Sequence, residues 1–398
     1  MRIQVLILPL AILAAACATP ERSSPTVTRS NAGDTIVITS HDTVPVVRAA
    51  SVRIVWQSPD LEAPGSMALV GGRLVAGDRT RFHVIDTATA AVTNVGRNGQ
   101  GPGEFGSVSA VATWHADSIA VYDDRLQRLS IFTPDLAFAR SMLMTPHAPF
   151  VNPRRPRDVL RPTGSGVFVN RRENVHTDRP TRSALEWVDP AADTTTVLRS
   201  WPDMQYQEVE RGILAPTEIY GPHLVLAVSP THLLIAHGQG VDYCITVEPL
   251  AGEDTGVRRF CRDRPPIPVG PRVRHPDFSA IQNEDARRSH TGAVSRVAVA
   301  EHLPAYDALR FDDRGRLWVR TLGAAMADVH PWLLARFPEM GPAVRRWDVF
   351  DPGGELGRTV ELPAAFEPLI ILANRAYGFY TLASGEVVIG SVTTSAAW

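Results

Sequence analysis

The stretch Gly96-Arg97-Asn98-Gly99-Gln100-Gly101-Pro102-Gly103-Glu104-Phe105 decides how this sequence is interpreted. Its glycines and its proline are typical of tight turns, and a glycine-rich turn can also cradle a phosphate group when a helix follows it. Residues 107–113 come directly after the turn and have the composition of a strand, so no helix N-terminus faces the loop. We therefore interpret the stretch as a structural turn that leads into a strand.

A short strand pattern recurs six times on the two sides of this turn. Each copy has a turn with Gly or Asp, about four apolar residues and then a polar turn. The first two steps between copies are 45 and 48 residues, which suits a four-stranded sheet, and the later steps are longer and leave room for insertions. The copies are centred on Leu74, Ile119, Val167, Leu233, Leu317 and Phe379.

This repetition predicts an all-β protein, a six-bladed β-propeller with small helical insertions over residues 51–398. Each twisted sheet buries its two faces only against its neighbours, and a closed ring leaves no sheet without a neighbour. We expect residues 52–57 to pair as the outer strand of the last blade, residues 379–393. That pairing would close the ring by joining the two ends of the chain.

The glycine-rich turn resembles the segment between blades in NHL repeats. Val121-Tyr122-Asp123 and Arg128-Leu129-Ser130-Ile131-Phe132 continue the resemblance, and residues 311–319 and 347–354 contain similar halves of the repeat. The chain is thus similar to bacterial six-bladed propeller lipoproteins of the NHL-like type. Clear similarity covers about residues 95–135 and 306–363, whereas blade three and residues 263–306 depart from the pattern.

The resemblance implies structural roles for the residues of the turn. In such repeats the glycines make the turn, Phe105 packs between blades and Glu104 caps free backbone amides. Asp123 and Arg128 are expected to form a structural pair within one blade.

The N-terminus is interpreted as an export signal. Arg2 is followed by an apolar stretch, residues 3–16, that is too short to span a membrane as a helix. Leu13-Ala14-Ala15-Ala16-Cys17 resembles a bacterial lipobox in which Cys17 receives the lipid, although the leucine is one place earlier than usual. The alternative is ordinary signal-peptide cleavage with an incidental cysteine.

Residues 1–17 are therefore the predicted signal peptide and lipobox, and residues 18–50, rich in Thr, Ser, Pro and Asp, the predicted flexible tether. Residues 35–39 have some strand character, which would allow the last part of the tether to dock. We expect the protein in the cell envelope, lipid-anchored on the periplasmic side, and Ala18 favours the outer membrane. The lipid would be its contact with the membrane.

Cys244 and Cys261 are the two cysteines that remain after Cys17. Residues 241–247 and 257–262 have strand composition, and a hairpin that turns near residue 252 places the two cysteines opposite each other. Export implies an oxidising compartment, so we predict a disulfide between them. Two unpaired thiols are the alternative.

Composition excludes several kinds of chemistry. All 40 basic residues are arginine, so mechanisms that need a lysine amine, such as Schiff-base chemistry or a P-loop, are excluded. A net charge of −2 gives no overall attraction to nucleic acid, and we expect no nucleic-acid partner. We find no common catalytic motif and predict no catalytic residue, no cofactor and no metal ligand.

The predicted insertions all open on one face of the propeller. Residues 170–183 and 323–345 connect second to third strands, and residues 263–306 connect two blades. Parts of them, notably 279–300 and 330–337, are predicted to be helical and to form a wall or lid over one end of the channel.

Two stretches that serve this face are basic. Residues 145–183 and 258–296 each carry a net charge of +5. This asymmetry favours an anionic ligand or an acidic protein partner, whereas solvated loops of a lysine-free protein would also collect arginine. The candidate ligand-binding residues are Arg154, Arg155, Arg157, Arg171 and Arg172.

These features favour a non-catalytic binding or scaffold module that meets its ligand or partner at the insertion-bearing face. The alternative is a metal-dependent propeller enzyme of the lyase or lactonase kind, with its site at the central channel. A third hypothesis is a purely structural part of an envelope complex.

Overall fold

The computed structural model describes residues 26–393, and almost all of its regular elements are β-strands, which confirms the all-β prediction. The description leaves out residues 42, 50, 59–60, 62–63, 115–116, 144–159, 164–165, 174–180, 190–191, 193, 211–212, 230, 251–255, 280–283, 285–295 and 337–339. The predicted signal peptide with Cys17 also lies outside the described residues.

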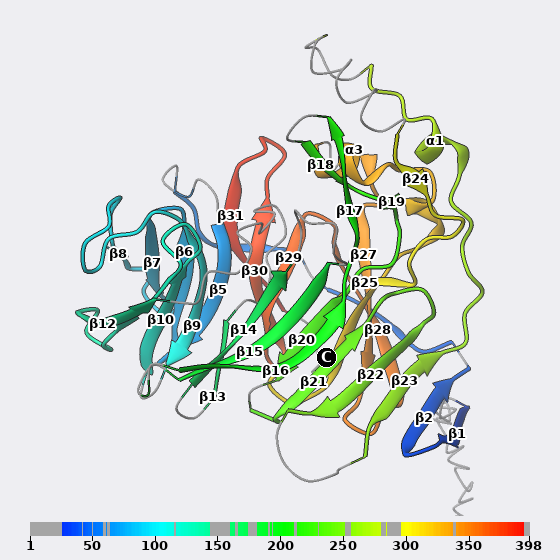
Figure 1. The fold of residues 1–398 in the computed structure, drawn as a ribbon, viewed down its shortest axis with the longest axis horizontal. Helices are drawn as coiled ribbons and strands as arrows, with labels where there is room; N and C mark the ends of the chain where they lie inside the picture. The colour runs from blue at the N-terminus through cyan, green and yellow to red at the C-terminus, as the bar shows by residue number, and fades with distance from the viewer. Residues whose placement is uncertain are drawn as a thin grey trace, which may run out of the picture.

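Six sheets of four or more strands follow one another along the described chain (Figure 1). Sheet 1 contains β5 (Pro64–Val70), β6 (Arg73–Asp78), β7 (Arg81–Asp86) and β8 (Val92–Val95). Sheet 2 contains β9 (Val108–Trp114), β10 (Ser118–Asp123), β11 (Arg128–Phe132) and β12 (Phe138–Leu143). Sheet 3 contains β13 (Leu160–Thr163), β14 (Gly166–Glu173), β15 (Arg182–Asp189) and β16 (Thr194–Pro202).

The second half of the chain continues the series. Sheet 4 contains β20 (Val225–Ser229), β21 (Leu234–Gly238), β22 (Cys244–Pro249) and β23 (Arg258–Arg262). Sheet 5 contains β25 (Tyr306–Phe311), β26 (Leu317–Thr321), β27 (Val344–Phe350) and β28 (Leu356–Pro363). Sheet 6 contains β29 (Phe366–Ile371), β30 (Arg375–Thr381) and β31 (Val387–Thr393).

The recurring strand pattern falls on the second strand of each sheet. Five of the six predicted centres lie within that strand, and Leu233 lies one residue before β21. The second strands whose side chains are described are mostly buried on both faces: in β6 and β10 only the first residue is not buried. The fourth strand β8, by contrast, is partly exposed throughout. Continuous apolar runs, rather than alternating apolar and polar residues, are typical of strands whose sheet packs against another layer on each face.

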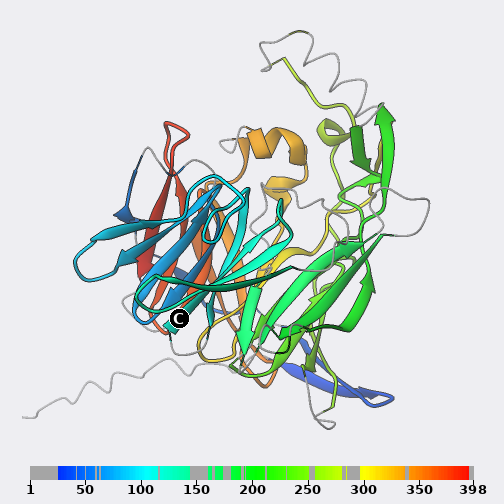
Figure 2. The same cartoon turned by 60° about the vertical axis from the view of Figure 1, so that its left-hand side comes forward.

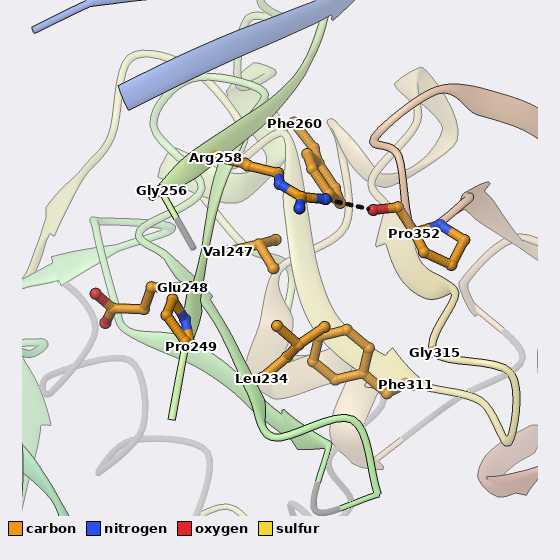
Figure 3. A pocket seen from close by; sticks show the side chains of 10 residues that line it. All are labelled: Leu234, Val247, Glu248, Pro249, Gly256, Arg258, Phe260, Phe311, Gly315 and Pro352. Carbon is orange, nitrogen blue, oxygen red and sulfur yellow. Dashed lines mark hydrogen bonds between the residues drawn. The ribbon is translucent and has the colours of Figure 1, made fainter. Parts of the chain in front are cut away.

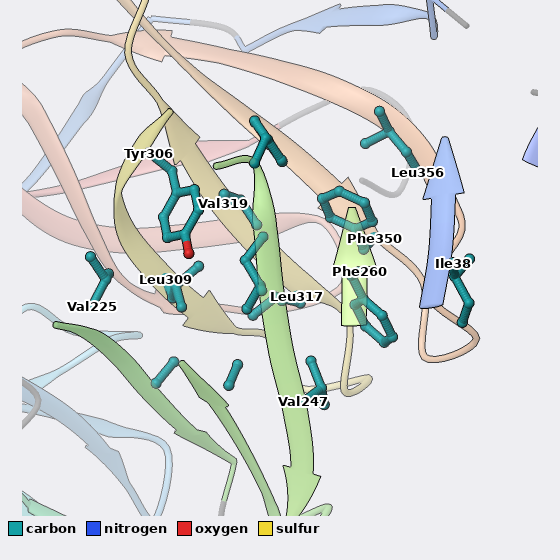
Figure 4. Close-up of a cluster of buried hydrophobic side chains, with 14 residues drawn as sticks. Ile38, Val225, Val247, Phe260, Tyr306, Leu309, Leu317, Val319, Phe350 and Leu356 are labelled. Atoms are coloured by element: carbon teal, nitrogen blue, oxygen red, sulfur yellow. The ribbon is translucent and has the colours of Figure 1, made fainter. Parts of the chain in front are cut away.

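Hydrophobic clusters join neighbouring sheets. Phe82 of sheet 1 meets Phe132 of sheet 2 with ring centroids 5.0 Å apart, and further clusters join sheets 3 and 4, sheets 5 and 6, and sheets 6 and 1. Between sheets 4 and 5, Phe260 stacks on Phe350 (Figure 4). Strand β9 of sheet 2 lies beside β13 of sheet 3. The core is therefore divided into seams between sheets.

The N-terminal strands correct the prediction of a flexible tether for residues 27–48, and the strand character expected of residues 35–39 is confirmed by the strand at Thr35–Ser40. We call residues 26–57 the N-terminal belt, because it lies along the outer edges of three successive sheets. Strand β2 (Thr35–Ser40) pairs with β23 of sheet 4 and carries β1 (Val27–Ala32) on its other side, and β3 (Val46–Arg48) pairs with β28 of sheet 5. Strand β4 (Arg53–Trp56) pairs with β31 of sheet 6, which is the pairing predicted for residues 52–57.

Apolar side chains explain why the belt docks. Ile38 of β2 is 3% exposed and belongs to the cluster of Phe260, Phe350 and Leu356 (Figure 4). Ser40 is fully buried, and its hydroxyl accepts a hydrogen bond of 3.2 Å from the amide of Leu356. The stretch is polar overall, which suggested a tether. Within it, however, the side chains of Thr35–Ser40 alternate between less buried and more buried positions, as in a docked strand.

The glycine-rich turn connects sheets 1 and 2 and has the structural roles that the NHL resemblance implies. Gly96 and Gly103 have φ angles of 92° and 71°, which favour glycine. The Glu104 carboxylate accepts hydrogen bonds of 2.8 Å from the Gly101 amide and from Arg97, and these contacts lower its pKa. Phe105 is fully buried between Phe82 and Phe132.

Asp123 and Arg128 lie opposite each other in the register of β10 and β11, but their side chains bind different parts of the turn. Asp123 accepts hydrogen bonds from the amides of Gly106 and Ser107, at 2.6 and 3.1 Å. Arg128 donates to the carbonyls of residues 100, 101 and 104. The predicted pair is thus structural, as expected, and acts by clamping the turn from two sides.

Cys244 and Cys261 form a disulfide across β22 and β23, with Cα atoms 4.1 Å apart. The two residues face each other in the hairpin register, so the sequence-based pairing is correct. The bond fixes the edge strand β23, on which β2 docks.

The remaining elements belong to connections between strands. Strands β17 (Tyr206–Glu210), β18 (Ile213–Pro216) and β19 (Glu218–Ile219) lie between sheets 3 and 4. Helix α1 (Pro271–Arg274) and β24 (Ala298–Val299) lie between sheets 4 and 5. Within sheet 5, the 3₁₀ helix η2 (Ala324–Met326) and α3 (Pro331–Arg336) connect β26 to β27.

Candidate functional site

Three connections pack together into one body, which we call the insertion wall: the described residues of 203–224, 263–305 and 322–343. Strand β19 pairs with β24, the Tyr220 hydroxyl donates to the Val329 carbonyl at 2.7 Å, and the Gly270 amide donates to the Ala327 carbonyl at 2.8 Å. A shared apolar cluster contains Ile219, Val269, Val273, Leu303, Leu322 and Met326. The wall stands at one end of sheets 4 and 5 (Figures 1 and 2).

The predicted insertions are partly borne out by this arrangement. Helix α3 confirms the helix expected within 330–337. In 279–300 most residues lie outside the described ones; Glu284 is helical, as predicted for part of this stretch, whereas Ala298 and Val299 form a strand. The contribution of 203–224 to the wall was not predicted.

Under the wall, β27 separates two groups of charged side chains. We call the group on the sheet 6 side the inner cluster: Asp307, Arg310, Arg320, Arg345 and Glu367. Arg320 binds both oxygens of Asp307, at 2.6 and 3.0 Å, and also donates to Glu367. Arg345 and Arg310 donate to the same Glu367 carboxylate, at 3.1 and 3.4 Å.

Burial and the neighbouring charges shift the pKa values of the arginines in the inner cluster. Desolvation lowers the pKa of Arg320, but Asp307 and Glu367 outweigh it and raise that pKa overall. Burial and the neighbouring Arg320 lower the pKa of Arg345. The Arg320 guanidinium also lies 5.6 Å above the Trp347 ring centroid, a cation–π contact. Three arginines thus converge on two carboxylates in a partly dry site.

We call the group on the sheet 4 side the outer cluster: Tyr243, Arg262, Arg264, Asp348 and Thr359. The fully buried Asp348 carboxylate accepts hydrogen bonds of 2.6 Å from both Tyr243 and Thr359, and it pairs with Arg262. Burial, with Asp348 nearby, raises the pKa of Tyr243 well above its usual value, so the phenol stays a donor.

Positive charge exceeds negative charge around β27. Arg264 donates to the Leu322 carbonyl at 2.6 Å, and burial lowers its pKa. Arg346 and Arg48 share the Glu361 carboxylate at the outer edge, at 3.0 and 2.9 Å. The two clusters and this edge bring together arginines 48, 262, 264, 310, 320, 345 and 346 with only the carboxylates of residues 307, 348, 361 and 367.

The candidate residues of the sequence analysis have different outcomes. Arg154, Arg155 and Arg157 lie outside the described residues. Arg171 and Arg172 lie near the end of β14, where their backbones pair with residues 184 and 183.

The clusters themselves were mostly missed from the sequence. Arg262 and Arg264 come from residues 258–296, the second basic stretch that was predicted to serve the insertion-bearing face. Arg345 and Arg346 were missed, although an arginine doublet at the end of an insertion was the available signal. Glu367 carried no signal of its own.

A small cavity of about 30 Å³ lies between sheets 4 and 5, at the ends of the strands away from the wall (Figure 3). Leu234, Val247 and Phe311 line it, and Arg258 closes one side by donating to the Pro352 carbonyl at 2.9 Å. The volume suits one or two water molecules, so this cavity is too small to hold an organic ligand.

Nowhere among the described residues do three or more His, Cys, Asp or Glu side chains gather as a metal site would require. The described helices include none long and apolar enough to cross a membrane.

His330 makes the insertion wall sensitive to acid. It is 4% exposed beside Phe278, and burial lowers its pKa from 6.5 to about 4. The native state therefore holds a neutral imidazole. The contribution of His330 to the free energy of unfolding is fully present above pH 6.5. It is lost as the pH falls from 6.5 to 4, because the unfolded chain takes up a proton that the native state does not. We expect a loss of about 2 kcal/mol from pH 7 to about pH 5.

Urea unfolding at the two pH values measures this effect. His330→Leu should reduce the pH dependence, whereas His275→Leu, at an exposed position of the same wall, should keep it. An unchanged pH dependence in His330→Leu would exclude His330 as its source.

Comparison with known proteins gives the fold but no family. No family model matches the chain, and no curated protein matches its sequence. A member of the DUF4221 family from Bacteroides vulgatus has a TM-score of 0.53 at 9% identity, over 87% of this chain and 97% of that one. A predicted exported protein from Bacteroides fragilis (TM-score 0.48, 12% identity, 90% and 99% covered) and virginiamycin B lyase from Staphylococcus aureus (0.44, 9%, 86% and 99%) are more distant in structure.

At these identities the likeness concerns the fold alone. Together with the series of antiparallel sheets, it gives this chain a β-propeller fold.

Proposed function

We propose that this chain is an exported, lipid-anchored binding module: a six-bladed, NHL-like propeller that holds an anionic ligand or an acidic protein partner at the face bearing the insertion wall. The observation that carries the proposal is the excess of arginine around β27, where arginines 262, 264, 310, 320 and 345 are partly or largely buried. The alternative of a metal-dependent enzyme has no comparable group of side chains in its favour among the described residues.

Six blades and a closed ring are supported by the seams between sheets. Clusters such as that of Leu74, Phe379 and Ile389 connect sheet 6 back to sheet 1. Pairing of β4 with β31 gives sheet 6 four strands, three from the C-terminal end and one from the N-terminal belt. An NHL-like origin is supported by the turn at residues 96–105, whose contacts match the roles that the resemblance implies.

Export and anchoring are supported by chemistry at two places. The lipobox resemblance ends at Cys17, the proposed site of lipid attachment. The Cys244–Cys261 disulfide suits an oxidising compartment such as the periplasm. We place the anchor in the outer membrane because Ala18 follows the cysteine.

Anion binding follows from the state of the arginines. Guanidinium groups bind carboxylates and phosphates through two parallel hydrogen bonds, and partial burial strengthens each bond. In the inner cluster, three arginines donate to the single carboxylate of Glu367. A bound anion would therefore reduce the repulsion between their guanidinium groups. The ligand class is therefore an organic carboxylate or phosphate. The candidate arginines 154, 155, 157, 171 and 172 belong to the same proposed basic surface by their sequence alone.

The test compares two double variants that remove equal charge. Arg345→Gln with Arg346→Gln removes two arginines beside β27. Arg140→Gln with Arg199→Gln removes two exposed arginines on the outer strands of sheets 2 and 3. We expect only the first pair to weaken binding to inorganic phosphate in titration calorimetry, by about tenfold for each lost charged hydrogen bond.

Elution from heparin should move to lower salt in the same variant. Equal shifts of the elution salt in both double variants would mean that only net charge matters. Unchanged phosphate binding in the variant of Arg345 and Arg346 would refute the proposed site. Replacing Arg154, Arg155 and Arg157 by Ala tests the extended surface in the same way. Thermal shifts on adding calcium or zinc would instead favour the metal-dependent enzyme.

A further inference from the structure

The N-terminal belt changes the distance at which the protein can stand from a membrane. A tether of residues 18–50 would have allowed the domain to move freely over a wide range. The belt instead begins at Thr26 and docks at once, with Val27 opposite Ser40 in the β1–β2 hairpin. Only residues 18–26 separate Cys17 from the folded domain.

Chain geometry then sets an upper limit. Nine residues span at most about 30 Å, whatever conformation they adopt. A domain of this length is about 50 Å across. A lipid on Cys17 would therefore hold the outer edge of sheet 4 at the membrane, while the opposite side of the molecule could not reach it.

The belt also has the surface chemistry of an interfacial segment. Ile36, Val46 and Ile54 are 41%, 51% and 43% exposed and lie on β2, β3 and β4. Strands β3 and β4 are the edges of sheets 5 and 6, whereas β2 lies inside sheet 4 with β1 as the edge. Large apolar side chains on edge strands are unusual, because an edge is normally kept polar to prevent association. Val46 and Ile54 are thus exposed on two successive edges, as Leu143 and Val197 are on β12 and β16, so the short segment after Cys17 decides which of these edges can meet the membrane.

Arginines accompany these apolar side chains. The side chain of Arg48 is 82% exposed beside its partner Glu361, that of Arg29 is 55% exposed beside its partner Glu355, and Arg53 is also exposed. Apolar groups that insert at the level of the headgroups, together with arginines that reach anionic lipids, are the combination by which proteins lie on a bilayer.

We propose that the belt edge of sheets 4 to 6 lies on the membrane surface, with anionic lipid headgroups as its partner. This inference rests on the proposed lipid anchor at Cys17. Strands β8 and β12 of sheets 1 and 2 lie on the side of the molecule away from β1 and β2 (Figures 1 and 2), and they face away from the membrane.

The experiment uses the full-length lipidated protein in vesicles that contain phosphatidylglycerol. A fluorophore is attached at Arg53→Cys on the belt or, as the matched control, at Thr93→Cys on β8, also an exposed edge position. Energy transfer to a labelled lipid headgroup should be several-fold higher from position 53 than from position 93. Equal transfer from the two positions would overturn the proposed orientation.

Two further measurements keep the outcomes separate. Flotation with the vesicles and the mass of the N-terminal peptide test the anchor itself, so failure there refutes the lipid anchor and not the geometry of the belt. Insertion of about 20 Gly and Ser residues after Ala18 should leave transfer from position 53 high if belt contacts hold the edge down. Replacing Ile36, Val46 and Ile54 by Ser in that long-tether protein should then lower it, and unchanged transfer would refute the belt contacts.

Discussion

Asp348→Ala is expected to lower the free energy of unfolding by about 3–5 kcal/mol, because it breaks a buried ion pair from one side. The change leaves Arg262 without its carboxylate and leaves the buried Tyr243 hydroxyl without the acceptor it now has at 2.6 Å. Loss of the Thr359 hydrogen bond adds to the effect. The midpoint of urea unfolding, with the slope unchanged, measures the loss.

Asp351→Ala is the matched control, since Asp351 lies on the exposed turn that follows the same strand and accepts one backbone hydrogen bond of 2.9 Å. Its effect should stay near 1 kcal/mol. A similar loss in both variants would mean that the outer cluster does not couple sheets 4 and 5. Asp348→Asn, which keeps the shape but loses the charge, should fall between them.

Phe105→Ala is the second change for which we expect a large effect, about 3–5 kcal/mol of folding stability. The ring is fully buried at the seam of sheets 1 and 2, with centroids 6.2 Å from Phe82 and 6.0 Å from Phe132. The seam cannot collapse to fill the space, because both sheets are held by their other neighbours. Thermal unfolding of the purified domain measures the loss.

Phe138→Ala provides the comparison within the same cluster. Phe138 also contacts Phe132, at 5.8 Å, but it is only partly buried and should contribute less. Gly96→Ala tests the same packing from the other side, because a Cβ there would lie 2.6 Å from the Phe105 ring at a φ of 92°. Wild-type stability in Phe105→Ala would show that the turn does not hold the two sheets together.

The fold class was predictable because its signals are local. The glycines of residues 96–105, the strand that follows and the recurrence of buried second strands all depend on short-range geometry and on burial of both strand faces. The pairing of Cys244 with Cys261 was predictable for the same reason, since a hairpin fixes its own register. The outer strand at Arg53–Trp56 needed one further argument, that a series of blades must close.

Other features depend on contacts between distant parts of the chain. Residues 27–48 look like a tether because polar residues dominate them, and only the open edges of β23 and β28 make strands of them. Ala298 and Val299, at the end of the stretch 279–300 that was predicted to be helical in part, form a strand because β19 offers them a partner. Local composition cannot show that a distant part of the sequence provides a sheet edge on which a segment can pair.

The sequence by itself therefore determined the all-β class, the repeated sheets, the structural role of the Gly96–Phe105 turn and the disulfide. Only the tertiary structure decided where charge gathers. Arg320, Arg345 and Glu367 are far apart in the chain and meet because β26, β27 and β29 bring them to one end of two neighbouring sheets. Local propensity fixes strands and turns over a few residues, whereas a site made of charges exists only after the sheets have packed.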